Sequence, residues 1–214
     1  MNEDDDDDEN DLKMNLPNKL TVSRFALTAF FLWALLSPIP FGKTLALIFF
    51  CAASFTDFLD GRIARNRKLI TNFGILMDPL ADKILVCSAF IAFVESSHVA
   101  VSQGGTPVKV AAWMVIIIVA RELAITGLRL LAASKSVVLA AEKFGKHKTV
   151  SQIIAIIALL TTDACREWPS ALQKFLEGWA PEFAKIALWV AVALTAASGA
   201  IYLWRNRAIY LSEM

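Results

Sequence analysis

The stretch that decides the fold runs from Asp57 to Asp82 and reads DFLDGRIARNRKLITNFGILMDPLAD. Asp57 and Asp60 are three residues apart on one side of a short basic segment, and Asp78 and Asp82 are four residues apart on the other. In a helix, either spacing puts both carboxylates on one side. The sequence before the first pair and after the second is apolar. We therefore expect two consecutive helices that bring four acids together near the turn between them.

The rest of the chain predicts a membrane protein. Of its 214 residues, 57% are hydrophobic and 19% are charged, and the mean hydropathy is +0.54, which argues against an ordinary soluble domain. Apolar stretches occupy residues 20–37, 44–59, 73–94, 108–133, 149–162 and 183–204. Two of them, 44–59 and 149–162, fall short of the roughly 20 residues that cross a bilayer, but each adjoins polar sequence that would still be helical, 57–67 and 146–152. We expect an all-α, polytopic protein, with one domain of six transmembrane helices over residues 13–214.

Charge is distributed unevenly along the chain. Eight of the 20 acidic residues lie in the first eleven positions, so residues 1–12 are expected to form a disordered acidic tail. This tail lacks the basic and apolar regions of a secretory signal, so we expect it to remain uncleaved. The rest of the chain contains 21 basic and 12 acidic residues. The basic residues lie in short segments between apolar runs, which indicates a membrane surface or an anionic substrate and no nucleic-acid partner.

The basic residues also predict the orientation in the membrane. Thirteen Lys and Arg residues fall in the connections of one side, five on the other, and three inside apolar stretches. The side richer in Lys and Arg is normally cytoplasmic. Both termini and the connections around residues 62–68 and 135–148 are therefore expected in the cytoplasm.

Several charged residues lie at similar depth in the predicted bundle. At about 1.5 Å per residue, Asp57, Asp82 and Arg121 are each roughly 18–20 Å from the outer end of their helix. Charges inside a membrane usually mark a functional site. Four carboxylates without His or Cys suit Mg²⁺ or Mn²⁺ better than zinc, and the three cysteines are too far apart in sequence to form a ligand pair. Alternatively, the acids form structural ion pairs with nearby basic residues, namely Arg62, Arg65, Lys83 and Arg121.

The aspartate motif resembles the signature of the CDP-alcohol phosphotransferases. Its pattern is Asp-x2-Asp-Gly-x2-Ala-Arg-x8-Gly-x3-Asp-x3-Asp, and all eight fixed positions match. The resemblance implies a homodimeric six-helix enzyme of the bacterial inner membrane, in which a hydroxyl group displaces CMP from a CDP-linked substrate. It further implies two divalent cations, Mg²⁺ or Mn²⁺, held by Asp57, Asp60, Asp78 and Asp82. Asp82 matches the family's general base.

The same resemblance implies a set of contacts to the CDP-linked lipid: Asn18, Thr21, Asp60, Gly61, Ala64, Arg65 and Gly74. Gly61 and Ala64 carry no bulky side chain beside the first aspartate pair, so a nucleotide could approach the backbone there. Small residues such as these, and Gly74, are also common helix-packing positions. Asn18 could equally cap the first helix, with Thr21 in its first turn.

Three further segments resemble the branch of the family that uses CDP-diacylglycerol and sn-glycerol 3-phosphate as substrates. They are NLPNKLTVSR at 15–24, ARELAITGLR at 120–129 and GKHKTVSQ at 145–152. The acceptor's phosphate is dianionic and needs cationic partners, for which the candidates are Arg121, Arg129, Lys146 and Lys148. The two lysines could instead serve only the membrane orientation. Glu122 could face Lys83 or a helix end, and its role stays open.

Two other functions remain possible at this point. The same chemistry could use another acceptor, such as inositol phosphate or serine, because the aspartate motif does not encode the acceptor. The intramembrane acids could also bind the cargo of a cation transporter.

Overall fold

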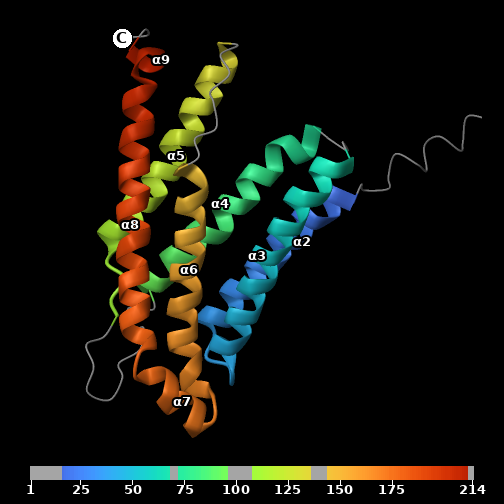
Figure 1. The fold of residues 1–214 in the computed structure, drawn as a ribbon. Helices are drawn as coiled ribbons and strands as arrows, with labels where there is room; N and C mark the ends of the chain where they lie inside the picture. The colour runs from blue at the N-terminus through green and yellow to red at the C-terminus, as the bar shows by residue number, and fades with distance from the viewer. Residues whose placement is uncertain (1–15, 68–71, 96–107, 136–143, 212–214) are drawn as a thin grey trace, which may run out of the picture.

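The structure, a computed structural model, describes residues 16–67, 72–95, 108–135 and 144–211. Within these ranges it describes all side chains except those of residues 16–21, 57–67, 72–79, 82, 144–146, 208 and 211. The described residues form no β-strand (Figure 1). Their helices are α2 (Leu16–Leu36), α3 (Gly42–Arg67), α4 (Asn72–Glu95), α5 (Ala112–Ser134), α6 (Phe144–Ala164), the 3-10 helix η1 (Cys165–Glu167), α7 (Ser170–Glu177), α8 (Ala180–Arg205) and α9 (Arg207–Leu211).

The long helices coincide with the predicted apolar stretches, and the all-helical prediction is confirmed. As expected, α3 continues through the polar sequence to Arg67, and α6 already begins at Phe144. α5 begins four residues after the start of its apolar stretch, because Ala111 is extended, with φ −78° and ψ 140°. The segment before the last long helix is partly helical. That segment contains η1 and α7, and Pro181 lies in the first turn of α8, where its missing N–H group costs no hydrogen bond.

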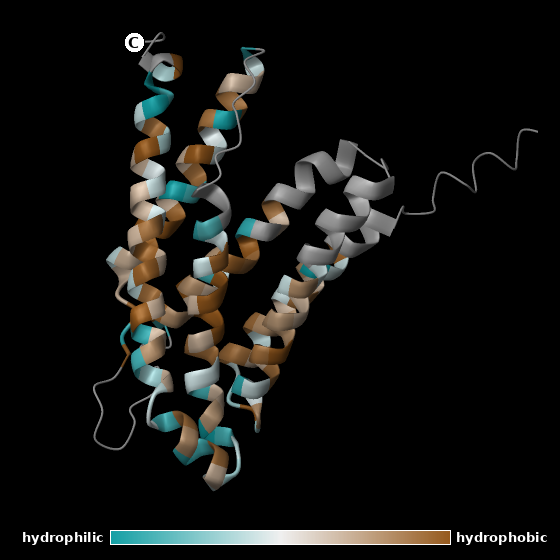
Figure 2. Ribbon diagram, in the orientation of Figure 1, coloured by the Kyte–Doolittle hydropathy of each residue, from teal (hydrophilic) through white to brown (hydrophobic). Residues whose placement is uncertain are grey.

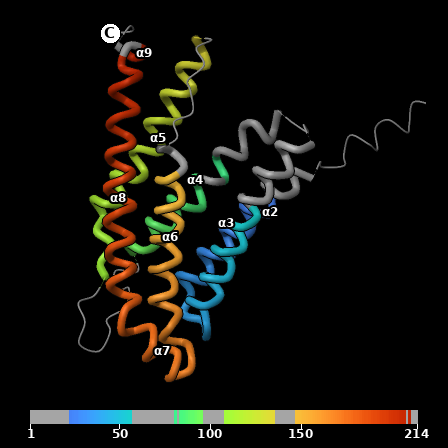
Figure 3. Tube along the Cα trace, viewed as in Figure 1, coloured from blue at the N-terminus to red at the C-terminus, as the bar shows by residue number. Residues whose placement is uncertain are grey.

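Successive long helices run in opposite directions (Figure 1). α2 packs along α3, and α6 packs along α8, while α4 contacts α2, α5 and α6. The trace in Figure 3 shows α6 descending to α7 and α8 returning beside it. The end of α3, the start of α4 and the start of α6 therefore point away from α7, as the C-terminus does. We call this side of the molecule the motif end and the other side the α7 end.

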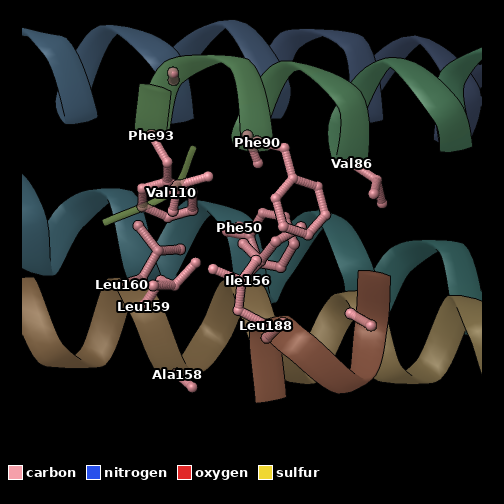
Figure 4. Packing of buried hydrophobic residues seen from close by; sticks show 14 of the residues in the cluster. Phe50, Val86, Phe90, Phe93, Val110, Ile156, Ala158, Leu159, Leu160 and Leu188 are labelled. Atoms are coloured by element: carbon pink, nitrogen blue, oxygen red, sulfur yellow. The ribbon is translucent and has the colours of Figure 1, made fainter. Parts of the chain in front are cut away.

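The core consists of aromatic side chains that pack among small residues. Phe31 of α2 and Phe50 of α3 are fully buried with ring centroids 5.5 Å apart. Figure 4 shows Phe90 of α4 pointing toward Phe50 and Ile156 of α6. Many of the other buried positions are alanine, including Ala34, Ala46, Ala53, Ala89, Ala155, Ala184 and Ala191. Alanine at these positions lets the helix backbones approach closely.

α8 carries its small residues inward and its large residues outward. Ala191 and Gly199 are buried, whereas Ile186 is 61% exposed and Trp189 is 50% exposed. This arrangement is the reverse of a soluble helix and is typical of a helix that packs in lipid. By length and composition, two helical segments of the described chain could cross a membrane, His147–Glu167 and Ala180–Arg205. Figure 2 shows hydrophobic residues along their middle parts and hydrophilic residues around α7.

Glu167 fixes the start of α3 at the α7 end. Its Oε1 accepts a hydrogen bond from the backbone N–H of Lys43 at 2.9 Å, and its Oε2 accepts one from the backbone N–H of Thr44 at 2.8 Å. The Thr44 hydroxyl also donates to Oε2, at 2.6 Å, and Trp168 donates from its ring nitrogen to that hydroxyl. The first N–H groups of a helix have no partner within the helix and favour a negative charge. Glu167 therefore acts as an N-cap supplied by a distant segment.

Candidate active site

The four motif aspartates lie on the two helices that meet at the motif end. Asp57 and Asp60 are in the last turns of α3, and Asp78 and Asp82 are in the first turns of α4. The helical backbone makes each pair share one side of its helix. Their side chains lie outside the described part of the chain, so the carboxylate cluster stays a prediction.

The other predicted contacts to the CDP-linked lipid are also placed by their backbone alone. Asn18 and Thr21 lie in α2, while Gly61, Ala64 and Arg65 lie in α3. Gly74 is the third residue of α4, and Lys146, a candidate phosphate contact, is the third residue of α6. Because α2 is already helical at Leu16, Asn18 is inside the helix, and the alternative that it caps this helix was wrong.

A buried cluster of charged side chains joins α5 to α6. Glu122 is 6% exposed and Lys148 is 4% exposed. The Lys148 ammonium donates a hydrogen bond to Oε1 of Glu122. Arg121 donates to the same oxygen at 3.3 Å. Two of the four candidate phosphate contacts, Arg121 and Lys148, are thus brought together on one acid that the sequence left unassigned.

Lys83 extends this cluster to α4. Its ammonium donates a hydrogen bond to the hydroxyl of Thr126, which itself donates to the backbone carbonyl of Glu122 at 2.7 Å. The charges of Glu122 and Arg121 act on both Lys83 and Lys148. Since Lys83 directly follows Asp82 in sequence, the cluster adjoins the part of α4 that carries the second aspartate pair. The cluster therefore connects α4, α5 and α6.

Arg129 is the third candidate phosphate contact whose side chain the structure describes. It lies two turns further along α5. Its Nε donates to the hydroxyl of Tyr202 at 3.4 Å, and its guanidinium carbon lies 5.8 Å from the centre of the Tyr202 ring. A cation over an aromatic face is stabilised by the charge distribution of the ring. The Arg129 side chain is exposed and contacts Tyr202 of α8.

α8 supplies two features that the sequence analysis missed. Gly199 lies against Arg121: a Cβ atom at Gly199 would come within 2.7 Å of the Arg121 Cγ. One turn away, Gln152 of α6 donates a hydrogen bond to the Thr195 hydroxyl at 2.9 Å, and both side chains are buried. The position of Gln152, four residues after Lys148, was the only available signal for this contact. Gly199 gave none, because single small residues are common throughout apolar helices.

The cationic side chains of this cluster could contact an anionic group. Among the side chains that the structure describes, the cations of Lys83, Arg121 and Lys148 lie around the carboxylate of Glu122. Arginine offers paired donors to a phosphate, and lysine offers a compact charge.

A cavity of about 550 Å³ lies at the α7 end. Leu35, Leu36, Lys43, Glu95, Asp163, Arg166 and Glu167 line it. Its walls come from the ends of α2, α4 and α6 that are remote from the motif aspartates, so it is separate from the candidate site. In the described residues, no group of three His, Cys, Asp or Glu side chains is arranged to hold a metal ion.

Comparison with known proteins gives a consistent result across almost the whole chain. Residues 14–197 match the family model described as CDP-alcohol phosphatidyltransferase. A CDP-diacylglycerol--glycerol-3-phosphate 3-phosphatidyltransferase from Bacillus subtilis (strain 168) is 42% identical over 204 residues, which cover 90% of this chain and 95% of that protein.

Relatives of the same name occur in other organisms. The protein from Escherichia coli (strain K12) is 32% identical over 213 residues, covering 94% of this chain and all of that protein. A second protein of this name from Arabidopsis thaliana is 35% identical over 157 residues, covering 70% of this chain and 65% of that protein. With the complete aspartate motif and the family match over most of its length, the chain belongs to the CDP-alcohol phosphatidyltransferase family of membrane enzymes.

Proposed function

We propose that the protein transfers the phosphatidyl group of CDP-diacylglycerol to sn-glycerol 3-phosphate, giving phosphatidylglycerophosphate and CMP. The observation that carries this proposal is the 42% identity, over 90% of the chain, to a protein named for that reaction. The cations Lys83, Arg121 and Lys148 support it, because the acceptor brings an anionic phosphate.

The family generally uses divalent metal ions, and the donors available on α3 and α4 fit such ions. Asp57, Asp60, Asp78 and Asp82 offer only carboxylate oxygens, the donors that Mg²⁺ and Mn²⁺ prefer. Two such ions held by these residues would neutralise the charge that develops on the leaving phosphate.

The protein's own residues would then orient the acceptor and move one proton. Arg121 and Lys148, with Arg129 and Lys146 toward the cytoplasm, would hold the phosphate of sn-glycerol 3-phosphate. The C1 hydroxyl oxygen of the acceptor forms a bond to the phosphorus nearest the lipid, and the bond from that phosphorus to the CMP oxygen breaks. The hydroxyl proton passes to Asp82. The transfer is direct, without a covalent enzyme intermediate.

The lipid substrate would remain in the bilayer during this reaction. Asn18, Thr21, Gly61, Ala64, Arg65 and Gly74 would surround its cytidine diphosphate, while its acyl chains lie against the apolar outside of the helices. We further propose that α2, α3, α4, α5, α6 and α8 all span the bacterial inner membrane, that the motif end and both termini face the cytoplasm, and that the enzyme is a homodimer. The outward-facing large side chains of α8 support the membrane setting.

The direct test measures CMP release by the purified protein with CDP-diacylglycerol and Mg²⁺. The acceptors to compare are sn-glycerol 3-phosphate, inositol phosphate, serine and none. We expect release that depends on sn-glycerol 3-phosphate. Release with another acceptor alone would move the enzyme to a different branch of the family. Metal flux into liposomes without CMP release would support the transporter instead.

Asp82→Asn tests the base and the metal site together. We expect it to abolish CMP release, because the amide cannot accept the proton and is a weaker ligand for the metal. The matched control is Glu95→Gln, the same acid-to-amide change at the opposite end of α4, which should keep wild-type activity. Treatment with EDTA should also abolish release, and added Mg²⁺ or Mn²⁺ should restore it. Normal activity of Asp82→Asn or of the EDTA-treated protein would contradict this mechanism.

A further inference from the structure

The short helix α7 carries large apolar side chains on the outside of the described structure. Phe175 is 68% exposed and Leu172 is 46% exposed. Trp179, the residue that precedes α8, is 48% exposed. Several large apolar side chains exposed in one place usually mark a contact surface. The proposed reaction gives these residues no role, because they lie at the end of the molecule remote from the motif aspartates.

α7 has one apolar and one polar side. Leu172, Phe175 and Leu176 follow one another at intervals of three and one, which places them on the same side of a helix. Lys174 and Glu177 lie on the opposite side of the same two turns. The helix is therefore amphipathic, as a helix between an apolar and an aqueous phase would be.

Only part of the apolar side is used to hold α7 in place. Leu176 is buried in a small cluster with Cys165 of η1 and Ala180 of α8, and Trp168 packs against this cluster. Leu172 and Phe175 belong to the same side of α7 but remain outside the cluster. The contacts within the described protein thus fix the helix while these two side chains face outward.

The exposed side chains of α7 continue into the outer surface of α8. The rings of Trp179 and Phe183 are 6.0 Å apart. Phe183 and Ile186 are both exposed, and their spacing places them on one side of α8. This side carries the large outward-facing residues that are typical of a helix in lipid. The apolar surface of α7 is therefore an extension of the lipid-facing surface of α8.

The position of α7 in the chain indicates its depth in the membrane. It connects the two described segments that could cross a bilayer, His147–Glu167 and Ala180–Arg205 (Figure 1). A connection of this kind lies where both segments leave the lipid. Tryptophan is favoured at that boundary, and amphipathic helices lie there with the apolar side toward the acyl chains. The lipid around α8 can reach Phe175 and Leu172 directly, so a lipid surface fits them better than a separate protein partner.

We propose that α7 binds the surface of the lipid bilayer at the α7 end of the molecule. Leu172, Phe175 and Trp179 would lie between the lipid headgroups and the acyl chains, while Lys174 and Glu177 face water. The contact would hold the start of α8 at the membrane surface. This proposal depends on the membrane setting of the family but not on the identity of the acceptor, so it is tested without measuring CMP release.

The experiment uses the full-length protein without its three native cysteines, reconstituted into vesicles of phosphatidylcholine and phosphatidylglycerol. A nitrobenzoxadiazole fluorophore is attached to Phe175→Cys or, as a second reporter, to Leu172→Cys. The matched control is Lys174→Cys, an exposed position on the polar side of the same helix. Lipids with a nitroxide near the headgroup end of the acyl chain should quench either reporter at least about twice as strongly as the control.

Iodide, a quencher dissolved in water, distinguishes the other possibilities. We expect iodide to quench the label at Lys174→Cys more strongly than the label at Phe175→Cys. Strong quenching at Phe175→Cys by iodide and not by the nitroxide lipid would show that this side of α7 faces water. Protection from both quenchers would show that another protein, or a second copy of this chain, covers it. Either result would overturn the proposal.

A charge on the apolar side tests whether these side chains hold α7 in the lipid. Phe175→Asp, combined with the reporter at Leu172→Cys, should lower quenching by the nitroxide lipid at least about twofold, because a charged side chain is unfavourable in lipid. Ser170→Asp adds the same carboxylate on the polar side and should leave quenching unchanged. Phe175→Ser replaces Phe175→Asp if that variant does not fold. Equal quenching with and without the substitution at Phe175 would contradict the proposal.

Discussion

Gly199 sets how closely α8 approaches the cation cluster. The stem of Arg121 lies directly over this glycine, since an added Cβ would come within 2.7 Å of Arg121 Cγ and 3.6 Å of its Cβ. These atoms belong to the rigid base of the side chain, so the arginine could make room only by moving as a whole. The glycine therefore determines where the guanidinium group lies relative to Glu122.

We predict that Gly199→Ala lowers kcat/KM for sn-glycerol 3-phosphate by roughly tenfold, because small displacements of a substrate-orienting group are costly. The assay is CMP release at varied acceptor concentration. Gly127→Ala is the matched control, since a Cβ at Gly127 meets nothing within 4 Å. That change should keep wild-type activity, and alanine favours the helix by about 1 kcal/mol. Equal activity of the two variants would contradict this account.

The motif acids could be predicted from the sequence, but the neighbours of the charged residues could not. Fixed spacing within a helix made the two aspartate pairs recognisable from the sequence alone. Glu122 was ambiguous because a residue in an apolar helix can face several neighbours, and the partner it has in the structure, Lys148, comes from the next helix. The close contact between Gly199 and Arg121 depends on how α8 lies against α5, which no local pattern encodes.

Among the helices, α3 illustrates how one end can be fixed far from the site. Glu167 of η1 accepts hydrogen bonds from two backbone N–H groups and one hydroxyl at the start of α3. Near its other end, α3 carries Asp57 and Asp60. Because a helix is stiff along its axis, fixing its start also fixes the depth of these aspartates. The cap is therefore expected to matter both for stability and for the alignment of the motif.

Glu167→Gln should lower the free energy of unfolding by about 1–2 kcal/mol, because the amide loses both the charge and one acceptor oxygen at the helix start. For a chain of this size the expected decrease in Tm is about 2–8 °C, measurable by thermal unfolding in detergent. Glu177→Gln, which affects a hydrogen bond within α7, should change Tm by less than about 1 °C. An unchanged Tm for Glu167→Gln would show that the cap contributes nothing.

The long helices could be predicted from hydropathy, but α7 could not. Their apolar stretches are long enough to stand out, and the structure moves their ends by only a few residues. The segment from Ser170 to Glu177 mixes polar and apolar residues between a proline and a glycine, so no apolar stretch marks it as a helix. The N-cap by Glu167 was also not predictable, since it joins segments more than 120 residues apart.

The whole molecule has two chemically different ends. Lys148, Lys83 and the backbone positions of all four motif aspartates lie toward the motif end, while α7 and the cavity lined by Glu95 and Asp163 lie at the other. The uneven count of Lys and Arg residues predicts that the motif end is cytoplasmic. This orientation would give the water-soluble acceptor access from the compartment in which it is made.

Cysteine accessibility tests this orientation. In a background without the three native cysteines, Lys174→Cys on α7 should react with a membrane-impermeant maleimide in intact spheroplasts. Lys135→Cys at the end of α5 should react only after the membrane is permeabilised. Both lysines are exposed in the structure, so burial does not bias the comparison. The opposite labelling pattern would reverse the proposed topology, and labelling of both in intact spheroplasts would show that the two sites share one side.

The bond between Glu122 and Lys148 also has a consequence for biogenesis. It joins two successive helices, so it cannot form until α6 has followed α5 out of the ribosome. Until then α5 would carry Arg121, Glu122 and Arg129 into the translocon with no partner from a later helix, and charged residues make the insertion of an isolated helix unfavourable by a few kcal/mol each. We therefore expect α5 to remain at the translocon until α6 has emerged, and the two helices to enter the lipid together.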